Sequence, residues 1–388
     1  MEGSTLSNFS QTDNSTDSSD YDYPMFEYYE EPVWIQAIFI FLYGTVSVLG
    51  IFGNGIVCYI VLGHPLMRTV TNYFIVNLAI GDLLMAAMCV NFTVYATLYT
   101  RWPFGELMCK LVSFSQTISV SVSIYTLVAI GVDRYFAIIH PLRPRMGSKE
   151  TLFVIGVIWV ISVALALPAA LFTTVESQGE STFCTDGSWE DSLVYSLVCM
   201  VLQYFLPLAV LMGAYVRIGK RIWGRRTPGE VEAERDKKMS ESKARLVKMF
   251  ATIVLLFALC YMPIQIYTIM QDSNRDILYF YYIKIVYLCA LLCAMSNCVY
   301  NPFIYCWMNI KFRNGFRSVF RFLPCVNYQG DWNGFTGLRR ANTAQTQTET
   351  MSMGSRNDRG RWWTQDQAKI AKNGRASNSD GETRTSFM

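Results

Sequence analysis

The chain has 388 residues, of which 52% are hydrophobic and 16% are charged, and its formal net charge at pH 7 is +3. Its apolar residues gather in seven blocks, each close to the roughly 20 residues that cross a bilayer as a helix. A soluble protein would have to expose too much of this apolar surface, so a soluble globular class is excluded. The predicted spans are 36–62, 70–98, 106–139, 150–172, 193–222, 246–270 and 281–306.

The segment before the first span, residues 1–35, contains eight acidic residues and no Lys or Arg. This composition predicts a disordered tail, and it lacks the basic and apolar regions of a cleavable signal peptide. Sequons at Asn8 and Asn14 predict glycosylation if the tail lies outside the cell. A further sequon at Asn91 lies inside the second span, where we expect no modification.

Lys and Arg are abundant after the third, fifth and seventh spans, whereas residues 171–216 contain five acidic residues and no basic one. Because basic loops stay on the cytoplasmic side, we expect an extracellular N-terminus and a cytoplasmic C-terminus in the plasma membrane. The predicted domains are an extracellular tail 1–35, a membrane domain 36–308, an amphipathic juxtamembrane helix 309–325 and a disordered cytoplasmic tail 326–388.

Eight of the eleven cysteines lie inside apolar spans, where Cys usually behaves as a small hydrophobic residue. Cys109 begins the third span and Cys184 lies in the long outer loop after the fourth. Both face an oxidising compartment, so we expect a disulfide that holds this loop over the mouth of the bundle. Cys325 follows the amphipathic stretch and is either a palmitoylation site or an ordinary free thiol.

Several polar residues interrupt the spans, among them Asn54, Asp82 and Ser123. A carboxylate inside a membrane needs partners or an ion. Asp82, Ser123, Asn297 and Asn301 therefore predict either a structural hydrogen-bond network or an allosteric sodium site. Kinks are expected at four prolines, which are Pro168, Pro207, Pro263 and Pro302.

We expect no enzyme, because the chain has only two histidines and no metal-ligand cluster, nucleophile motif or phosphate-binding loop. No inverted repeat or re-entrant filter is evident, which argues against a transporter or channel without excluding either. A nucleic-acid partner and a resident cofactor, apart from the sodium ion, are not expected either.

The motifs resemble those of rhodopsin-like G-protein-coupled receptors across about residues 36–325. The matching strings are "GN" ending at Asn54, "NLAIGD" ending at Asp82, "GVDRYFAIIHPL" at 131–142, Trp159, "YFLP" ending at Pro207, "FALCYMP" ending at Pro263 and "NPFIY" at 301–305. The resemblance implies an all-α membrane protein, a seven-transmembrane helix bundle with a short amphipathic eighth helix.

In that family the arginine matching Arg134 stays close to its neighbour, here Asp133, at rest and contacts a heterotrimeric G protein after activation. The resemblance therefore implies a G-protein switch made of Asp133, Arg134 and Tyr135, supported in the open arrangement by Tyr215 and Tyr305. The third inner loop is expected to form part of the G-protein surface. The Thr- and Ser-rich tail is expected to engage receptor kinases and arrestin, and membrane lipids surround the spans.

Three positions depart from the family pattern. Tyr261 replaces a tryptophan in the sixth helix, and the basic Lys243 replaces an acidic residue near its inner start, so an ionic lock to Arg134 is not expected. Gly81 stands where alanine is commoner, and we expect this change to matter little.

The ligand class follows from what is missing and what matches. Met295 stands where an opsin has its lysine, and Gln116 stands where amine receptors have an aspartate. Strings such as "RWPFGELMCK" and "NPFIYCWMN" resemble neuropeptide receptors of the tachykinin, neuropeptide Y and invertebrate RYamide/luqin types. The last two imply an amidated, Arg-containing peptide, with Asp272 pairing with its arginine and Gln116 and Gln203 binding its terminal amide. A tachykinin-type peptide is the alternative, and a transporter or channel is the more distant one.

Overall fold

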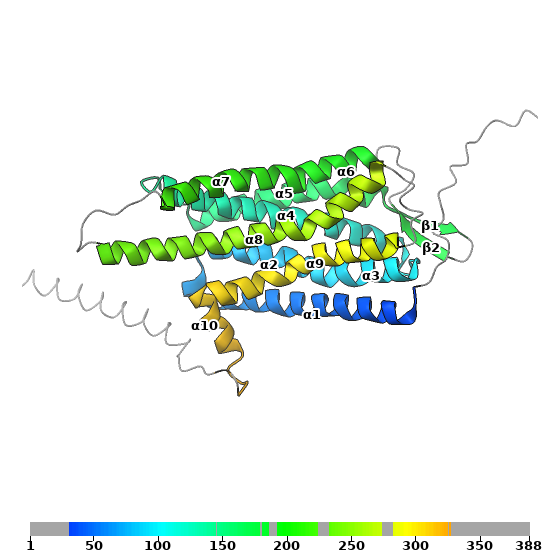
Figure 1. Ribbon diagram of the computed structural model, residues 1–388, viewed down its shortest axis with the longest axis horizontal. Helices are drawn as coiled ribbons and strands as arrows, with labels where there is room; N and C mark the ends of the chain where they lie inside the picture. Colours follow the sequence, from blue (N-terminus) through cyan, green and yellow to red (C-terminus); the bar gives the residue numbers. More distant parts are fainter. Residues whose placement is uncertain are drawn as a thin grey trace, which may run out of the picture. The chain divides into compact units, whose positions relative to one another are not determined.

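The computed structural model describes residues 31–144, 146–178, 181–185, 192–223, 233–273, 282–324 and 326. The chain divides into two compact units, residues 1–313 and 314–388. All seven membrane-length helices belong to the first unit (Figure 1).

The seven predicted spans are confirmed. Each is a helix long and apolar enough to cross a membrane, and the observed ends lie within a few residues of the predicted ones. These spans are Val33–Gly63, Val70–Tyr99, Gly105–Ile139, Ser148–Phe172, Val194–Ile222, Ala244–Gln271 and Ile283–Met308. Helices are the expected solution, because each backbone N–H and C=O inside lipid must find its partner within its own segment.

Five spans are single helices: α1 (Val33–Gly63), α4 (Gly105–Ile139), α5 (Ser148–Phe172), α8 (Ala233–Ser273) and α9 (Ile283–Met308). The second span combines α2 (Val70–Leu84), the π-helical η2 (Met85–Cys89) and α3 (Val90–Tyr99). The fifth combines α6 (Ser192–Met200), the π-helical η3 (Val201–Phe205) and α7 (Leu206–Trp223). A 3-10 turn, η1 (Pro65–Met67), joins α1 to α2.

The spans differ in how much of their surface the other helices cover. In the most apolar part of Val70–Tyr99, 67% of the residues are buried, against 17% in Ser148–Phe172. The second span is therefore central, and the fourth lies at the periphery with most of its apolar side chains turned outward. Phe153, which is 74% exposed on α5, is an example. In a membrane-spanning bundle such side chains face lipid rather than water.

Proline lies inside α5, α8 and α9, as Pro168, Pro263 and Pro302. Figure 1 shows α8 bending along its length. Pro207 is the second residue of α7 and directly follows the π-helical turn η3. Each proline lacks the N–H that would close a helical turn, so the bundle carries built-in points of bending.

Tyrosine hydroxyls tie several spans together by donating to main-chain carbonyls. The Tyr43 hydroxyl on α1 donates to the carbonyl of Leu288 on α9 at 2.7 Å. The Tyr204 hydroxyl in η3 donates to Ala258 on α8 at 2.8 Å, and Tyr125 on α4 donates to Leu202 at 3.2 Å. Helical carbonyls accept these bonds because each has a second lone pair.

The predicted all-α class omits one feature, a two-stranded antiparallel hairpin. Strands β1 (Thr174–Gln178) and β2 (Ser181–Thr185) pair with Val175 opposite Cys184. Neither strand shows a long alternating apolar pattern, and their ten residues are the only strands in the described part of the chain. The class is therefore a helical bundle with a small hairpin at one end.

A helix is present in the predicted amphipathic stretch. Helix α10 (Ile310–Val319) is shorter than the predicted range 309–325. Phe312 is fully buried and packs on the Tyr305 ring with centroids 5.4 Å apart, whereas Lys311 is exposed. Residues 1–30 and 327–388 lie outside the described residues, and so does Cys325. These ranges contain the predicted glycosylation sites Asn8 and Asn14 and the predicted arrestin segment.

Candidate functional sites of the bundle

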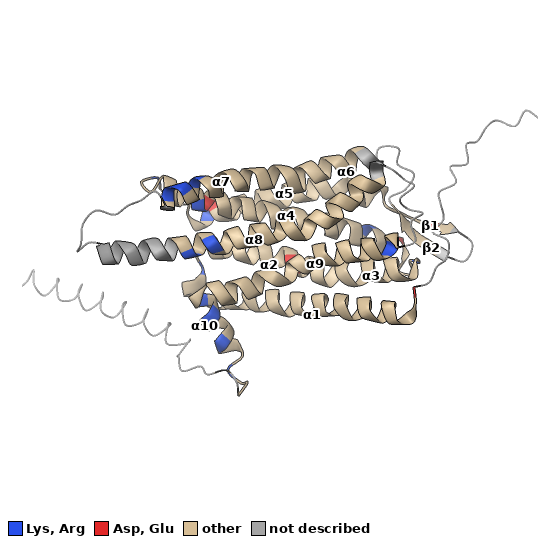
Figure 2. Cartoon of the chain, in the orientation of Figure 1, with Lys and Arg blue, Asp and Glu red and all other residues tan. Residues whose placement is uncertain are grey.

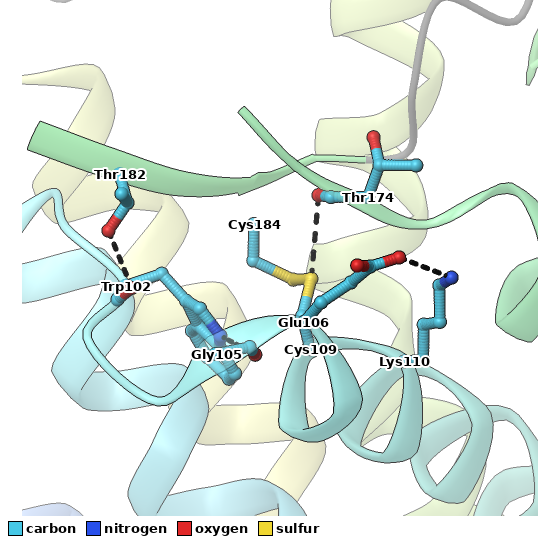
Figure 3. Close-up of a disulfide and its surroundings, with 8 residues drawn as sticks. All are labelled: Trp102, Gly105, Glu106, Cys109, Lys110, Thr174, Thr182 and Cys184. Carbon is cyan, nitrogen blue, oxygen red and sulfur yellow. Dashed lines mark hydrogen bonds and ion pairs between the residues drawn. A yellow bond between two sulfur atoms is a disulfide. The ribbon is translucent and has the colours of Figure 1, made fainter. Parts of the chain in front are cut away.

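A disulfide joins Cys109, in the second turn of α4, to Cys184 in strand β2, with a Cα–Cα distance of 5.7 Å (Figure 3). This confirms the predicted pair. The cysteines Cys58, Cys89, Cys199, Cys260, Cys289, Cys293 and Cys298, inside the spans, form no disulfide with another described residue.

A second attachment holds the same hairpin. The backbone N–H of Trp102 donates to the carbonyl of Thr182 at 2.6 Å, and the Thr182 hydroxyl donates back to the carbonyl of Trp102 at 2.7 Å. Trp102 is itself fixed, because it is 3% exposed and its indole N–H donates to the carbonyl of Gly105 at 2.8 Å. The hairpin is thus attached to the rest of the bundle by one disulfide and by hydrogen bonds to Trp102.

The two glutamines predicted to bind an amide lie on neighbouring elements. Gln116 is half-buried on α4, about two turns beyond Cys109. Gln203 lies in η3, which packs against α4, and it is 9% exposed. The Gln203 Nε2 has no hydrogen-bond partner within the described residues. A buried amide nitrogen without an acceptor is costly, so this group is available to a ligand.

The third residue predicted to bind the ligand is Asp272. Asp272 lies in the last turn of α8, and its side chain falls outside the described residues. Its pairing with a peptide arginine therefore stays a prediction.

Asp82, in the middle of the second span, is 3% exposed and has two hydrogen-bond donors. Asn301 Nδ2 donates to one carboxylate oxygen at 2.7 Å, and the Ser123 hydroxyl donates to the other at 3.4 Å. Asn297 is buried one turn before Asn301 but makes no hydrogen bond to Asp82 in the described structure. Three of the four predicted residues are thus brought into contact, from α2, α4 and α9.

At the end of the bundle opposite the hairpin, Arg134 is held by two neighbours. Its guanidinium pairs with the carboxylate of Asp133, with Nε 3.0 Å from Oδ2, and its Nη2 donates to the Thr71 hydroxyl at 2.7 Å. Tyr135 points into a small ring cluster with Phe136 and His140. The predicted Asp133–Arg134 contact is present.

The two tyrosines assigned to the open arrangement have buried hydroxyls. Neither the Tyr215 nor the Tyr305 hydroxyl has a hydrogen-bond partner within the described residues. A buried hydroxyl in this state costs about 1–3 kcal/mol. Any rearrangement that gives these hydroxyls a partner would remove this cost.

Residues 53–305 match the model of a protein family described as the 7 transmembrane receptor (rhodopsin family). This chain belongs to the rhodopsin family of seven-transmembrane receptors. It is 39% identical over 301 residues to a RYamide receptor of Tribolium castaneum, covering 74% of this chain and 81% of that protein. It is 38% identical over 343 residues to the Drosophila melanogaster RYamide receptor, covering 81% and 74%.

The similarity extends to vertebrate receptors. The human Substance-K receptor is 40% identical over 300 residues, which cover 76% of this chain and 75% of that protein. These relatives are neuropeptide receptors rather than enzymes, so the receptor is assigned to the class of multi-pass membrane receptors for neuropeptides.

One buried network of the receptor was missed by the sequence reasoning. Asn77 Nδ2 donates to the Thr126 hydroxyl at 2.7 Å, and the Trp159 indole N–H donates to Asn77 Oδ1 at 2.8 Å. The three side chains join α2, α4 and α5. Asn77 opens the quoted "NLAIGD" string, but a single polar residue in an apolar span does not indicate which helix holds its partner.

Thr71 was also missed. It is the second residue of α2, and sequence alone gave no reason to place its hydroxyl beside Arg134. The side chain of Lys243, which bears on the expected absence of an ionic lock, lies outside the described residues.

The expectation that Gly81 matters little stays a prediction, and it depends on how closely this residue lies to α4. A Cβ at this position would lie 3.1 Å from the Ser123 hydroxyl oxygen and 3.3 Å from a methyl group of Val122. Glycine therefore lets α2 approach α4 closely, next to the serine that contacts Asp82.

Tyr261 replaces the family tryptophan without leaving a polar group exposed. Its ring is 9% exposed and stacks on Phe257, with centroids 4.5 Å apart and an interplanar angle of 27°. The receptor thus keeps an aromatic contact along α8 at the point two residues before Pro263.

Proposed function

We propose that the receptor binds an amidated, Arg-containing neuropeptide of the RYamide/luqin or neuropeptide Y-like type and activates a heterotrimeric G protein. The observation that carries the ligand class is the buried Gln203 side chain with its unpaired Nε2. Gln203 lies about three turns into the span that begins at Ser192. A peptide carboxamide, with one acceptor and two donors, complements a glutamine amide at that depth.

The peptide's charge is the second part of the proposal. The N-terminal tail and the loop after the fourth span carry acidic residues without basic ones, and such a field attracts a cationic ligand. Asp272 is proposed to pair with the peptide's arginine, while Gln116 and Gln203 bind the terminal amide. The relatives named RYamide receptor support this class.

The proposed orientation places the hairpin outside the cell and the opposite end in the cytoplasm, in the plasma membrane. Figure 2 shows Lys and Arg gathered where α7 ends and where the apolar part of α8 begins, away from the hairpin. The positive-inside rule supports this orientation. Glycosylation of Asn8 and Asn14, palmitoylation of Cys325, and binding of receptor kinases and arrestin to the C-terminal tail are further parts of this proposal.

A cavity at the basic end supports a G-protein site. Its volume is about 460 Å³, and its wall includes Thr71, Arg245 and Lys311 but no acidic residue. Such a cavity suits a partner segment that ends in a carboxylate. Because Thr71 also holds Arg134, insertion of that segment would compete with the resting contacts of the arginine.

A sodium ion beside Asp82 is proposed as an allosteric ligand that stabilises the resting arrangement. The buried carboxylate and the nearby Ser123, Asn297 and Asn301 side chains offer the oxygen donors that a hard monovalent cation prefers.

Nucleotide exchange on purified G protein, with the receptor reconstituted in membranes, tests this function. We expect stimulation by a peptide with an Arg-aromatic-amide terminus and a much weaker response to the same peptide as a free acid. In competition binding, Asp272→Ala should weaken the Arg peptide by roughly 2–5 kcal/mol if the pair is desolvated. An analogue with citrulline in place of arginine should lose far less. Equal losses for both peptides would reject the role of Asp272.

A tachykinin-type ligand is the second candidate, favoured by the 40% identity to the human Substance-K receptor. An amidated tachykinin-type peptide without the terminal arginine belongs in the same exchange assay. If it acts at lower concentrations than the Arg-aromatic-amide peptide, the second candidate replaces the first. Substrate flux in vesicles without G protein would instead indicate a transporter or channel.

A further inference from the structure

The outward face of α7 changes from apolar to basic along its length. The exposed fraction is between 43% and 66% for Phe205, the last residue of η3, and for Leu206, Val210, Met212 and Val216 of α7. Arg217, Lys220 and Arg221 follow on the same side and are also exposed. In a membrane, this order places acyl chains against the first group and lipid headgroups against the second.

A groove of about 570 Å³ joins the end of α4 to the end of α7. Its apolar wall consists of Phe136, Ile139, Pro141 and Leu142, and its cationic groups are Arg143 and Arg221. His140 completes the wall, and no acidic residue lines it. The groove therefore combines an apolar floor with two guanidinium groups.

Arg143 is held in position before any ligand arrives. Its guanidinium carbon lies 4.7 Å from the centroid of the Phe136 ring, and its backbone N–H donates to the carbonyl of His140 at 3.1 Å. A cation stacked on a ring keeps its N–H donors pointing sideways, free for an anion.

These cations have no acidic partner in the described structure. The two ion pairs found there are Lys110–Glu106 and Arg134–Asp133. Arg143, Arg217, Lys220 and Arg221 form none among the described residues. A concentration of four positive charges beside an apolar face favours an anionic amphiphile over a neutral one.

We propose that this groove binds the phosphorylated headgroup of a phosphoinositide in the cytoplasmic leaflet, with its acyl chains along the apolar face of α7. Arg143 and Arg221 are the headgroup ligands, because a guanidinium fork matches phosphate oxygens and two forks suit a headgroup with more than one phosphate. Phosphatidylserine has a single phosphodiester and a zwitterionic serine group, so we expect it to bind to the two arginines less tightly. The site requires the proposed orientation, with the basic end in the cytoplasm.

Native mass spectrometry of the full-length receptor in detergent micelles, titrated with phosphatidylinositol bisphosphate, tests the site. Arg143→Gln and Arg221→Gln should each weaken the lipid's Kd by about tenfold, and the double variant by about a hundredfold, as expected for lost charge-assisted hydrogen bonds. The matched control is Lys149→Gln, which removes an exposed charge at the start of α5, outside the groove. It should leave the Kd unchanged.

Four results would overturn the proposal. They are an unchanged Kd in the double variant, an equal loss in Lys149→Gln, equal binding of phosphatidylserine, and equally tight binding of the soluble inositol trisphosphate headgroup, which would indicate a free phosphate ligand.

Thermal melting of each variant shows whether a loss reflects unfolding. For a variant with a lowered Tm, the Lys replacements Arg143→Lys and Arg221→Lys keep the charge and should restore part of the affinity. The measurement uses neither peptide nor G protein, so its failure is distinguishable from failure of the proposed function.

Discussion

At the hairpin end, strand β2 is joined to α4 by a disulfide and to the preceding loop by two hydrogen bonds between Trp102 and Thr182. At the opposite end, the guanidinium of Arg134 is held only by side-chain contacts, with the adjacent Asp133 and with Thr71 on α2. The first set of bonds includes a covalent one and main-chain groups that cannot rotate away. The second can be exchanged by rotating one arginine side chain.

Two groups of tyrosines differ in whether their hydroxyls have a partner. The hydroxyls of Tyr43, Tyr125 and Tyr204 each donate to a main-chain carbonyl of a neighbouring span. The Tyr215 and Tyr305 hydroxyls are buried without a partner in the described structure. A bundle with a disulfide at one end and only exchangeable side-chain contacts around Arg134 at the other can change packing at the second end while the first keeps its shape.

The largest effect is expected from removing the Arg134 side chain, which makes the exchangeable contacts. Arg134→Ala should abolish G-protein activation and leave peptide binding largely intact, because the hairpin end does not depend on this side chain. Nucleotide exchange and radioligand binding on the same membranes measure the two properties. Arg134→Lys, which keeps the charge without the planar fork, is the matched variant and should retain part of the activity. Normal exchange by surface-expressed Arg134→Ala would contradict the switch.

Removing the covalent bond tests the fixed end. Cys109→Ser and Cys184→Ser should each destabilise the receptor by about 2–5 kcal/mol and impair peptide binding. The double variant should be no worse than either single one, because both remove the same bond. Thermal unfolding and saturation binding measure these effects.

The control for this series is Cys289→Ser, which changes an exposed free thiol and should do little. Additive losses in the double variant, in protein that reaches the cell surface, would show that the two cysteines act separately.

Sequence alone predicted the spans because an apolar block of about 20 residues has one stable form in lipid, a helix. It predicted the disulfide because Cys109 and Cys184 were expected at the outer end of a span and in an outer loop. It did not predict the hairpin, whose strands "TVESQ" and "STFCT" lack a clear alternation. Their pairing depends on tertiary contacts, namely the disulfide and Trp102.

The polar contacts between spans were predicted only where a carboxylate inside a span required a partner. Asp82 with Ser123 and Asn301 was found in this way, whereas Asn77 with Thr126 and Trp159 was not. Helical periodicity shows which face of a span is inward, but the rotation and depth of each neighbour decide which polar groups meet. The rotation and depth of each helix depend on the packing of the whole bundle, so they cannot be read from one span alone.

A smaller effect is expected from changing Asp82, which lies in the middle of the second span. Asp82→Asn should remove the sodium dependence of agonist affinity, because the neutral amide no longer attracts the cation. Agonist competition curves with sodium and with a bulky organic cation measure this dependence. If sodium still shifts the curve in the variant by the wild-type amount, the ion binds elsewhere or not at all.

The smallest effect concerns Gly81, which lies beside the central site. Gly81→Ala adds a methyl group 3.1 Å from the Ser123 hydroxyl oxygen, so overpacking of about 1–3 kcal/mol opposes a helix-propensity gain of up to about 1 kcal/mol. We expect a modest net loss of thermal stability and a weaker sodium effect, because Ser123 must move from Asp82. In a Ser123→Ala background the same substitution should cost less, which is a non-additive coupling. Gly156→Ala on α5, where nothing lies within 4 Å of the new methyl, is the matched control and should not lower stability. Equal costs of Gly81→Ala in both backgrounds would show that the serine hydroxyl does not set the close approach of α2 to α4.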